Sequence, residues 1–445
     1  MSNRFGSIRR FSLCSSTFCL IVLLMAVFAM PAQADSQARI VRLSDVHGSV
    51  QIDKNSGMGF ESAFLNLPVT QGTQIRTRDN GRVEIEFEDG STLRVAPNSR
   101  IEFSRLGLND SGVRLSAVNL ADGTAYVNWL GKTSDQFTLN FSREKVDLDH
   151  AAHFRVDTSP ELTKFAVFKG EVQLAGPSGA VTVGKKKMVT FNADDDKATL
   201  AANIEEEPLD SWDKQAVEYH DQYSRNNSSP YAYGSSDLNY YGSYMTVPGY
   251  GMMWQPYFTN AGWDPFMDGA WSWYPGMGYM FVSAYPWGWM PYRYGNWRMV
   301  PGFGWMWQPG SWNSWAAIPR YAGTPAAGFH APVAPTGTIN TVVVGKGGPV
   351  LSPVLPSHLT LAPGSAGIGV PRGSLGNLKP LNREVAKSGL LQVRPAPQFS
   401  AMSNSSSGAR AGGSYGSARG ETSVSAGVHG SAASSSHSGS ASGHH

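Results

Sequence analysis

The residues best suited to metal or acid–base chemistry lie in one short stretch, where Asp147 and Asp149 precede His150 and His153. Imidazole and carboxylate groups are common zinc ligands, and two histidines three residues apart share one face of a helix. Residues 154–157, however, alternate apolar and polar as a strand does, and on a strand the two histidines point to opposite faces. The pattern favours a solvated strand end over a metal site, and we expect no metal and no other cofactor.

A second candidate for chemistry is the carboxylate pair Asp264 and Asp268, which lies among tryptophans. Two carboxylates in a cleft can hydrolyse a glycosidic bond. Both residues sit in Pro/Gly turn sequences, where an aspartate hydrogen-bonds its own backbone. We favour the turn role and predict that the protein is not an enzyme, with a glycan-active hydrolase as the lesser alternative.

Aromatic side chains are the sharpest feature, because eleven of the thirteen tryptophans lie in residues 246–320. Several form pairs two residues apart, which project to one face of a strand. Most are expected to form the core of a small domain. We expect, however, that these 75 residues cannot bury every ring, so that some form an exposed platform for a sugar or a protein. The predicted platform residues are Trp254, Trp271, Trp273, Trp287, Trp289, Tyr292, Tyr294, Trp305 and Trp307.

The same segment is internally repetitive. Residues 249–256 return as 276–283 and again as 302–309, and residues 263–271 return as 289–297, at offsets of 26 or 27 residues. A unit this short, punctuated by Gly and Pro, is typical of β-hairpins rather than helix pairs.

Residues 38–200 read as short strands with turn signals at regular spacing, the pattern of an all-β domain. In the clearest hairpin, a three-residue loop of Glu88, Asp89 and Gly90, with Gly90 left-handed, places Ile85 opposite Leu93 and Glu84 opposite Arg94. A two-residue Asp-Gly loop instead mixes apolar and charged side chains on one face. We predict the three-residue loop.

Several of these runs resemble one family, the FecR domain of bacterial envelope signalling proteins, over residues 40–190. The resemblance rests on Gly-Thr-Gln-Ile-Arg-Thr from residue 72, Arg-Val-Glu-Ile-Glu-Phe-Glu-Asp-Gly-Ser from 82, Leu-Ala-Asp-Gly-Thr-Ala-Tyr-Val from 120, His-Phe-Arg-Val from 153 and Val-Phe-Lys-Gly-Glu-Val from 167. It implies a β-rich periplasmic domain that, in the regulator members, passes a signal inward to a sigma factor. The chain departs from that plan, because only about a dozen residues precede its first apolar run. The Trp/Gly-rich segment resembles a module of unknown function that follows FecR-like domains.

The first 34 residues have the features of a secretory signal: Arg4, Arg9 and Arg10, an apolar run over 18–30, and Ala-Gln-Ala at 32–34. Both cysteines, at positions 14 and 19, fall inside it, so we expect no disulfide in the mature protein. The expected location is the periplasm or the cell surface, with no stable membrane span after cleavage. A signal retained as an anchor is the alternative.

The two remaining segments are expected to be a connector and a C-terminal tail. Residues 201–245 are predicted to be an acidic helical connector, with Asp210 as a candidate N-cap, followed by a Tyr-rich loop. Residues 321–445 carry eight Lys or Arg and two Glu in a Pro/Gly/Ser-rich sequence, which predicts a disordered basic tail. Such a tail could touch anionic envelope polymers, and no concentrated nucleic-acid-binding face is present.

Together these features predict an all-β protein: a FecR-like sandwich or roll, a Trp-rich hairpin module (246–320) and a tail. The predicted function is an exported, non-catalytic envelope binding or scaffold protein that contacts polysaccharide or protein through exposed aromatics. A FecR-type periplasmic sensor in transmembrane signalling is the alternative.

Overall fold

The computed structural model describes residues 39–131, 135–177, 179–192, 197–224, 232–310, 321–322, 343–344 and 358–396. The expected signal segment lies outside these ranges. Within them, no helix is both long enough and apolar enough to cross a membrane.

The N-terminal part is a 17-stranded sheet that folds into two layers, because strand β9 (Arg114–Trp129) belongs to both. The all-β prediction is therefore confirmed. The first layer has the order β3 (Glu61–Ser62), β2 (Val50–Asp53), β5 (Gln74–Thr77), β8 (Arg100–Leu108), β9, β10 (Gln136–Phe141), β11 (Glu144–Leu148), β14 (Glu171–Gly176), β15 (Gly179–Gly184).

The second layer uses the other half of β9, which pairs with β7 and β12. Its order is β4 (Pro68–Val69), β1 (Val41–His47), β6 (Arg82–Glu86), β7 (Thr92–Val95), β9, β12 (Ala152–Thr158), β13 (Leu162–Lys169), β16 (Lys187–Asn192), β17 (Ala198–Ala201).

Apolar side chains of the two layers face each other and form the core. Phe141 on β10 stacks on Phe165 on β13 with ring centroids 5.8 Å apart, which joins the layers directly. The predicted hairpin register is confirmed: Ile85 pairs with Leu93 and Glu84 with Arg94. Gly90 has φ +89°, a conformation that glycine adopts without steric cost, and it closes the predicted three-residue loop.

Two helices follow the sandwich. Helix α2 (Asp210–Tyr223) lies within the segment predicted to be a helical connector, but its N-cap is Leu209 and Asp210 is its first residue. The predicted N-cap is therefore wrong by one position. The stretch expected to be a Tyr-rich loop contains helix α3 (Ser235–Tyr241) and the start of strand β18 (Gly242–Val247).

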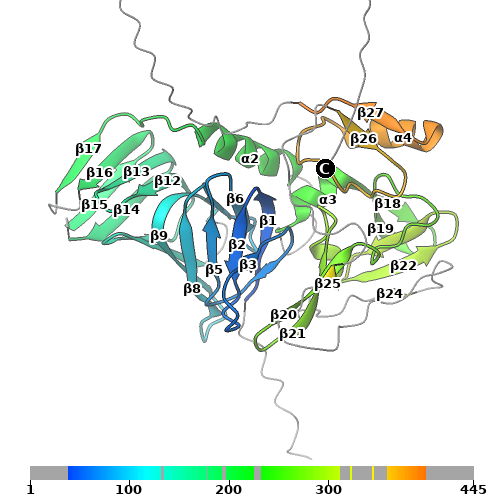
Figure 1. The fold of residues 1–445 in the computed structure, drawn as a ribbon, viewed down its shortest axis with the longest axis horizontal. Coiled ribbons are helices and arrows are strands. Elements are labelled where there is room, and N and C mark those ends of the chain that lie inside the picture. Colours follow the sequence, from blue (N-terminus) through cyan, green and yellow to red (C-terminus); the bar gives the residue numbers. More distant parts are fainter. Residues whose placement is uncertain are drawn as a thin grey trace, which may run out of the picture. The chain divides into compact units, whose positions relative to one another are not determined.

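The aromatic region consists of three hairpins, each with a Pro-Gly-x-Gly turn, and the short 3-10 helix η1 (Met290–Tyr292). One sheet has the order β18, β19 (Gly251–Pro256), β23 (Gly304–Gln308), β22 (Asn296–Val300), β24 (Tyr321–Ala322). Another has the order β21 (Gly278–Ser283), β20 (Gly269–Tyr274), β25 (Val343–Val344). Figure 1 shows these hairpins in green and yellow-green.

The first and third hairpins pair with each other in a locally two-fold manner. Trp254 on β19 lies opposite Trp307 on β23. The amide of Gln255 donates to the carbonyl of Phe303 at 2.7 Å, and the equivalent Gln308 donates to the carbonyl of Tyr250 at 2.7 Å. The middle hairpin has Val282 where the others have glutamine, so it cannot make this reciprocal contact, and it pairs with β25 instead.

Residues 358–396, called the C-terminal segment below, contain β26 (Leu359–Leu361), α4 (Leu378–Ser388) and β27 (Leu391–Val393). Asn377 caps α4, since its side chain accepts from the backbone N–H of Lys379 at 3.0 Å. The expectation of a disordered tail is wrong for these residues, because seven buried apolar side chains, from Leu359 to Val385, dock them onto the rest of the protein. The remainder of the predicted tail, apart from β24 and β25, lies outside the described residues.

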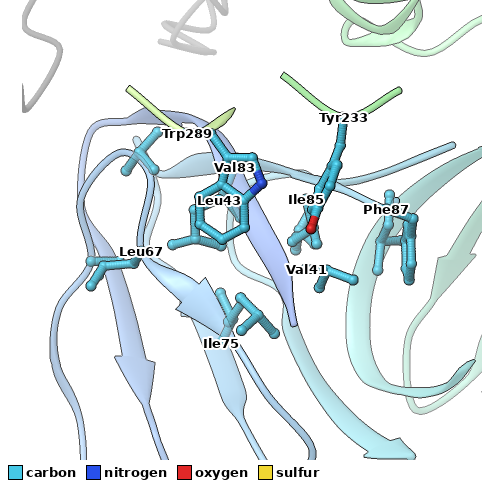
Figure 2. Packing of buried hydrophobic residues seen from close by; sticks show 14 of the residues in the cluster. Val41, Leu43, Leu67, Ile75, Val83, Ile85, Phe87, Tyr233 and Trp289 are labelled. Carbon is cyan, nitrogen blue, oxygen red and sulfur yellow. The ribbon is translucent and has the colours of Figure 1, made fainter. Parts of the chain in front are cut away.

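One hydrophobic core includes the sandwich, the aromatic hairpins and the C-terminal segment. Figure 2 shows Tyr233 and Trp289 entering the layer of aliphatic side chains of the sandwich, beside Leu43 and Ile85. Both aromatic residues are fully buried, and their rings meet edge to face at 5.5 Å. The aromatic region is thus built into the sandwich core.

Candidate functional site

The outward face of the second layer carries charged residues that are buried. On β6, Val83 and Ile85 face the core, and Glu84 and Glu86 face outward, yet each glutamate is only 1% exposed. A buried carboxylate without a partner is strongly unfavourable, so each needs a cation. Strand pairing supplies the first ones: Arg94 on β7 contacts Glu84 at 2.8 Å. Arg42 on β1 contacts Glu86 at 2.6 Å.

Helix α2 covers this face and adds two titratable side chains one heptad apart, Asp213 and His220. Asp213 accepts from Arg94 at 2.9 Å and hydrogen-bonds the ring of His153 at 2.7 Å. His220 contacts the Glu84 carboxylate at 2.9 Å through Nε2 and the Ser236 hydroxyl at 3.0 Å through Nδ1. The helix thus contributes directly to the site.

Asp237 on α3 and Arg372 of the C-terminal segment complete the cluster. Asp237 is fully buried and accepts from Arg42 and from the Tyr219 hydroxyl. Arg372 donates to both carboxylate oxygens of Asp237, each at 2.9 Å, and to Glu84 at 2.7 Å. We call these eight residues the ion-pair network: Arg42, Glu84, Glu86, Arg94, Asp213, His220, Asp237 and Arg372.

Opposing effects set the charge states in the network. Burial alone would raise the pKa of Glu84, but the charges of His220, Arg94 and Arg372 outweigh it and hold that pKa well below its ordinary value. Burial also acts to raise the pKa of Asp237, and the charges of Arg372 and Arg42 hold it below its ordinary value. Glu84 and Asp237 therefore remain ionised although they are buried.

A smaller charged cluster fixes the start of α2. Arg155 on β12 donates through one nitrogen to both carboxylate oxygens of Asp210, at 2.5 and 2.6 Å. The hydroxyl of Tyr126 on β9 donates to the same carboxylate at 3.0 Å. A carboxylate in the first turn also interacts favourably with the helix dipole. These contacts fix the position of the helix on the sheet.

The predicted aromatic platform is not exposed. Eight of its nine rings are at most 7% exposed, and Trp273 is half-buried. The prediction of exposed rings is therefore wrong for Trp254, Trp271, Trp287, Trp289, Tyr292, Tyr294, Trp305 and Trp307. It assumed that residues 246–320 must bury their own side chains, whereas the sandwich and the C-terminal segment share the same core.

Specific contacts orient several of these rings. The indole N–H of Trp287 donates to the carbonyl of Ala366 at 2.7 Å, and its ring stacks on Tyr285 at 4.9 Å. The indole N–H of Trp254 donates to Leu238, and that of Trp307 to Tyr294, at 3.0 and 2.9 Å. Buried indole N–H groups usually have such a partner, and these contacts indicate a structural role.

The other candidate residues also have structural partners. Asp264 accepts from the backbone N–H of Phe266 at 2.8 Å, the local turn bond expected from its sequence. Asp268 accepts from the Tyr285 hydroxyl at 3.0 Å. His150 contacts Asp149 and the Glu171 carbonyl, whereas His153 contacts Asp213, so the two histidines have different partners. Over the described ranges, no group of three or more His, Cys, Asp or Glu is placed to hold a metal ion.

Comparison with known proteins identifies two regions. Residues 73–173 match the FecR protein family, so the expected FecR domain is present, and they span β5 to the first half of β14 of the sandwich. Residues 235–336, which begin with α3 and include the three aromatic hairpins, match a family of unknown function, DUF6600. No curated protein matches the chain.

Among solved structures, the chain is similar to two crystal structures of a "putative anti-sigma factor" from Parabacteroides distasonis ATCC 8503. Both are 15% identical to it, with a TM-score of 0.27. The match to the structure at 2.50 Å resolution covers 33% of this chain and 71% of the other chain. The match to the structure at 1.65 Å resolution covers 35% of this chain and 76% of the other chain.

Proposed function

We propose that this protein is a non-catalytic, envelope-associated sensor of the FecR type, which transmits a binding event through a shared hydrophobic core. The FecR match supports the envelope signalling class. The observation that carries the proposal is the insertion of Tyr233 and Trp289 into the core of the sandwich. A shared core makes the FecR domain and the aromatic hairpins respond together, as a sensor requires.

Recognition in this proposal uses burial and ion pairing, and no bond is broken. Desolvation offsets much of the attraction within a buried ion pair, so we propose that these pairs select one arrangement of partners more than they add net stability. The ion-pair network joins the sheet, two helices and the C-terminal segment in this way. With the aromatic rings buried, we expect an envelope protein rather than a polysaccharide as the partner.

The proposed location is the periplasm or the cell surface, reached through the N-terminal signal. The intact mass of the exported protein tests whether this signal is cleaved. A mature N-terminus at Asp35 is expected for a protein released into the envelope. A retained signal would instead support an anchored sensor with a segment at the membrane.

The sensing role is tested by deleting the gene and comparing transcripts before and after an envelope stress. We expect a defined set of transcripts to lose its response. The wild-type gene should restore this response, and so should a variant altered at the exposed pair, Asp122→Asn. The variant Asp237→Asn, which alters the network, should not. An unchanged transcript response in the deletion strain, under conditions where the wild type makes the protein, would contradict the proposal.

A further inference from the structure

The contacts of Arg372 resemble those of a ligand in a binding site. Its guanidinium makes a two-pronged contact with Asp237, donates to Glu84 at 2.7 Å, and lies over the Tyr219 ring at 5.1 Å from the centroid. These groups come from α3, β6 and α2. A planar fork of donors that meets a carboxylate in two places and stacks on an aromatic ring is the geometry of arginine recognition.

The backbone around Arg372 runs through turns, and side chains from outside the C-terminal segment hold it in place. Three tyrosine hydroxyl groups donate to backbone carbonyls of the C-terminal segment: Tyr241 to Val370 at 2.7 Å, Tyr240 to Leu375 at 2.8 Å and Tyr223 to Gly376 at 3.1 Å. Such contacts fix the course of a peptide but read little of its sequence. Arg372 supplies the charge, and we expect it to supply the specificity.

The site also has the charge of a cation receptor. Without Arg372, the other seven network residues comprise four carboxylates, two arginines and His220. Burial acts to lower the pKa of Arg372, but the charges of Asp237 and Glu84 outweigh it and hold that pKa well above its ordinary value. A lysine would add the charge, but it lacks the planar fork that contacts both oxygens of Asp237.

We infer that the junction of β6, α2 and α3 is a binding site for an arginine-bearing peptide. The occupant in this structure is the chain's own C-terminal segment. An arginine peptide of a partner protein competes for the same place, so the segment acts as an internal competitor. This inference rests on the contacts of Arg372 and does not depend on the proposed sensing role.

Fluorescence anisotropy tests this inference with a labelled synthetic peptide that has the sequence of residues 366–378. The full-length variants are Arg372→Ala and, as the matched control on the same segment, Arg383→Ala, whose side chain is exposed. We expect Arg372→Ala to bind the peptide. The wild type and Arg383→Ala should bind it at least about tenfold more weakly, because their own segment occupies the site. A peptide with alanine in place of its arginine should lose roughly 30-fold or more in affinity.

Hydrogen exchange of the wild-type chain provides a second measurement, which does not depend on the folding of a variant. We expect amides of residues 359–393 to exchange faster than those of β12 and β13, and faster still with excess peptide. Two results would each overturn the inference. One is a folded Arg372→Ala chain that binds the arginine and alanine peptides equally or binds neither. The other is a C-terminal segment as protected as β12 and unaffected by peptide.

Discussion

At the residue scale, charge does not decide exposure in this protein. The alternation of Glu84 and Glu86 with Val83 and Ile85 was sufficient to predict strand, register and loop, because these depend on neighbours in the sequence. The burial of both glutamates could not be predicted in this way. The partners His220 and Arg372 of Glu84 lie 136 and 288 residues away in the sequence. No local pattern records such a pairing.

The network predicts a difference between two isosteric substitutions. Asp237→Asn removes a buried charge that two arginines share, so we expect the free energy of unfolding to fall by about 3–5 kcal/mol. Asp122→Asn removes an ion pair whose side chains are 56% and 45% exposed, and it should cost no more than about 1 kcal/mol. Urea unfolding followed by circular dichroism measures both. Equal losses would show that burial adds nothing to the Asp237 contacts.

The lowered pKa values of Glu84 and Asp237 predict sensitivity to acid. Unfolded carboxyls titrate near pH 4. Because the folded pKa values lie below this, the stabilisation is fully present above about pH 5 and is lost as pH falls through the folded values. The urea midpoint should therefore decrease from pH 6 to pH 3, and it should decrease less in Asp237→Asn. Identical decreases in the variant and the wild type would assign the acid sensitivity to other groups.

At the element scale, the repeated sequence predicted hairpins correctly but not the burial of their rings. The period and the Pro-Gly-x-Gly turns are local features, and the three hairpins follow from them. Burial depends on what packs against a hairpin. Trp287, for example, donates to Ala366 in the C-terminal segment, which composition alone had indicated to be disordered. Composition was misleading there because other parts of the chain supply most of the core that this segment joins.

The pairing of the first and third hairpins depends on two glutamines. We expect Gln308→Val, which copies the residue of the middle hairpin at Val282, to lower the free energy of unfolding by about 1–2 kcal/mol. Valine can neither donate to the Tyr250 carbonyl nor accept from Arg298, and each hydrogen bond has a net value of about 1 kcal/mol. Gln255→Val should cost a similar amount, because it breaks the reciprocal contact with Phe303. Thermal unfolding of the single and double variants measures both. If the double variant is as stable as the wild type, these contacts do not stabilise the pairing of the two hairpins.

At the scale of the whole molecule, the FecR domain and the aromatic hairpins are two family regions with one interior. A family match alone suggests separate modules joined by a linker. The structure joins them through Tyr233 and Trp289 in the sandwich core and through the hydroxyl of Tyr274, which donates to the Pro68 carbonyl at 2.8 Å. We expect Trp289→Ala to lower the free energy of unfolding by about 3–5 kcal/mol, as cavities left by large aromatic residues do.

The most direct test of this shared core is whether the two regions unfold together. Tryptophan fluorescence reports mainly on the aromatic hairpins, since eleven of thirteen tryptophans lie in residues 246–320. Far-ultraviolet circular dichroism reports mainly on the larger sandwich. In a urea titration of the wild-type protein, the account predicts coincident transitions for both signals. Two separated transitions, with the fluorescence change complete while the sandwich remains folded, would contradict it.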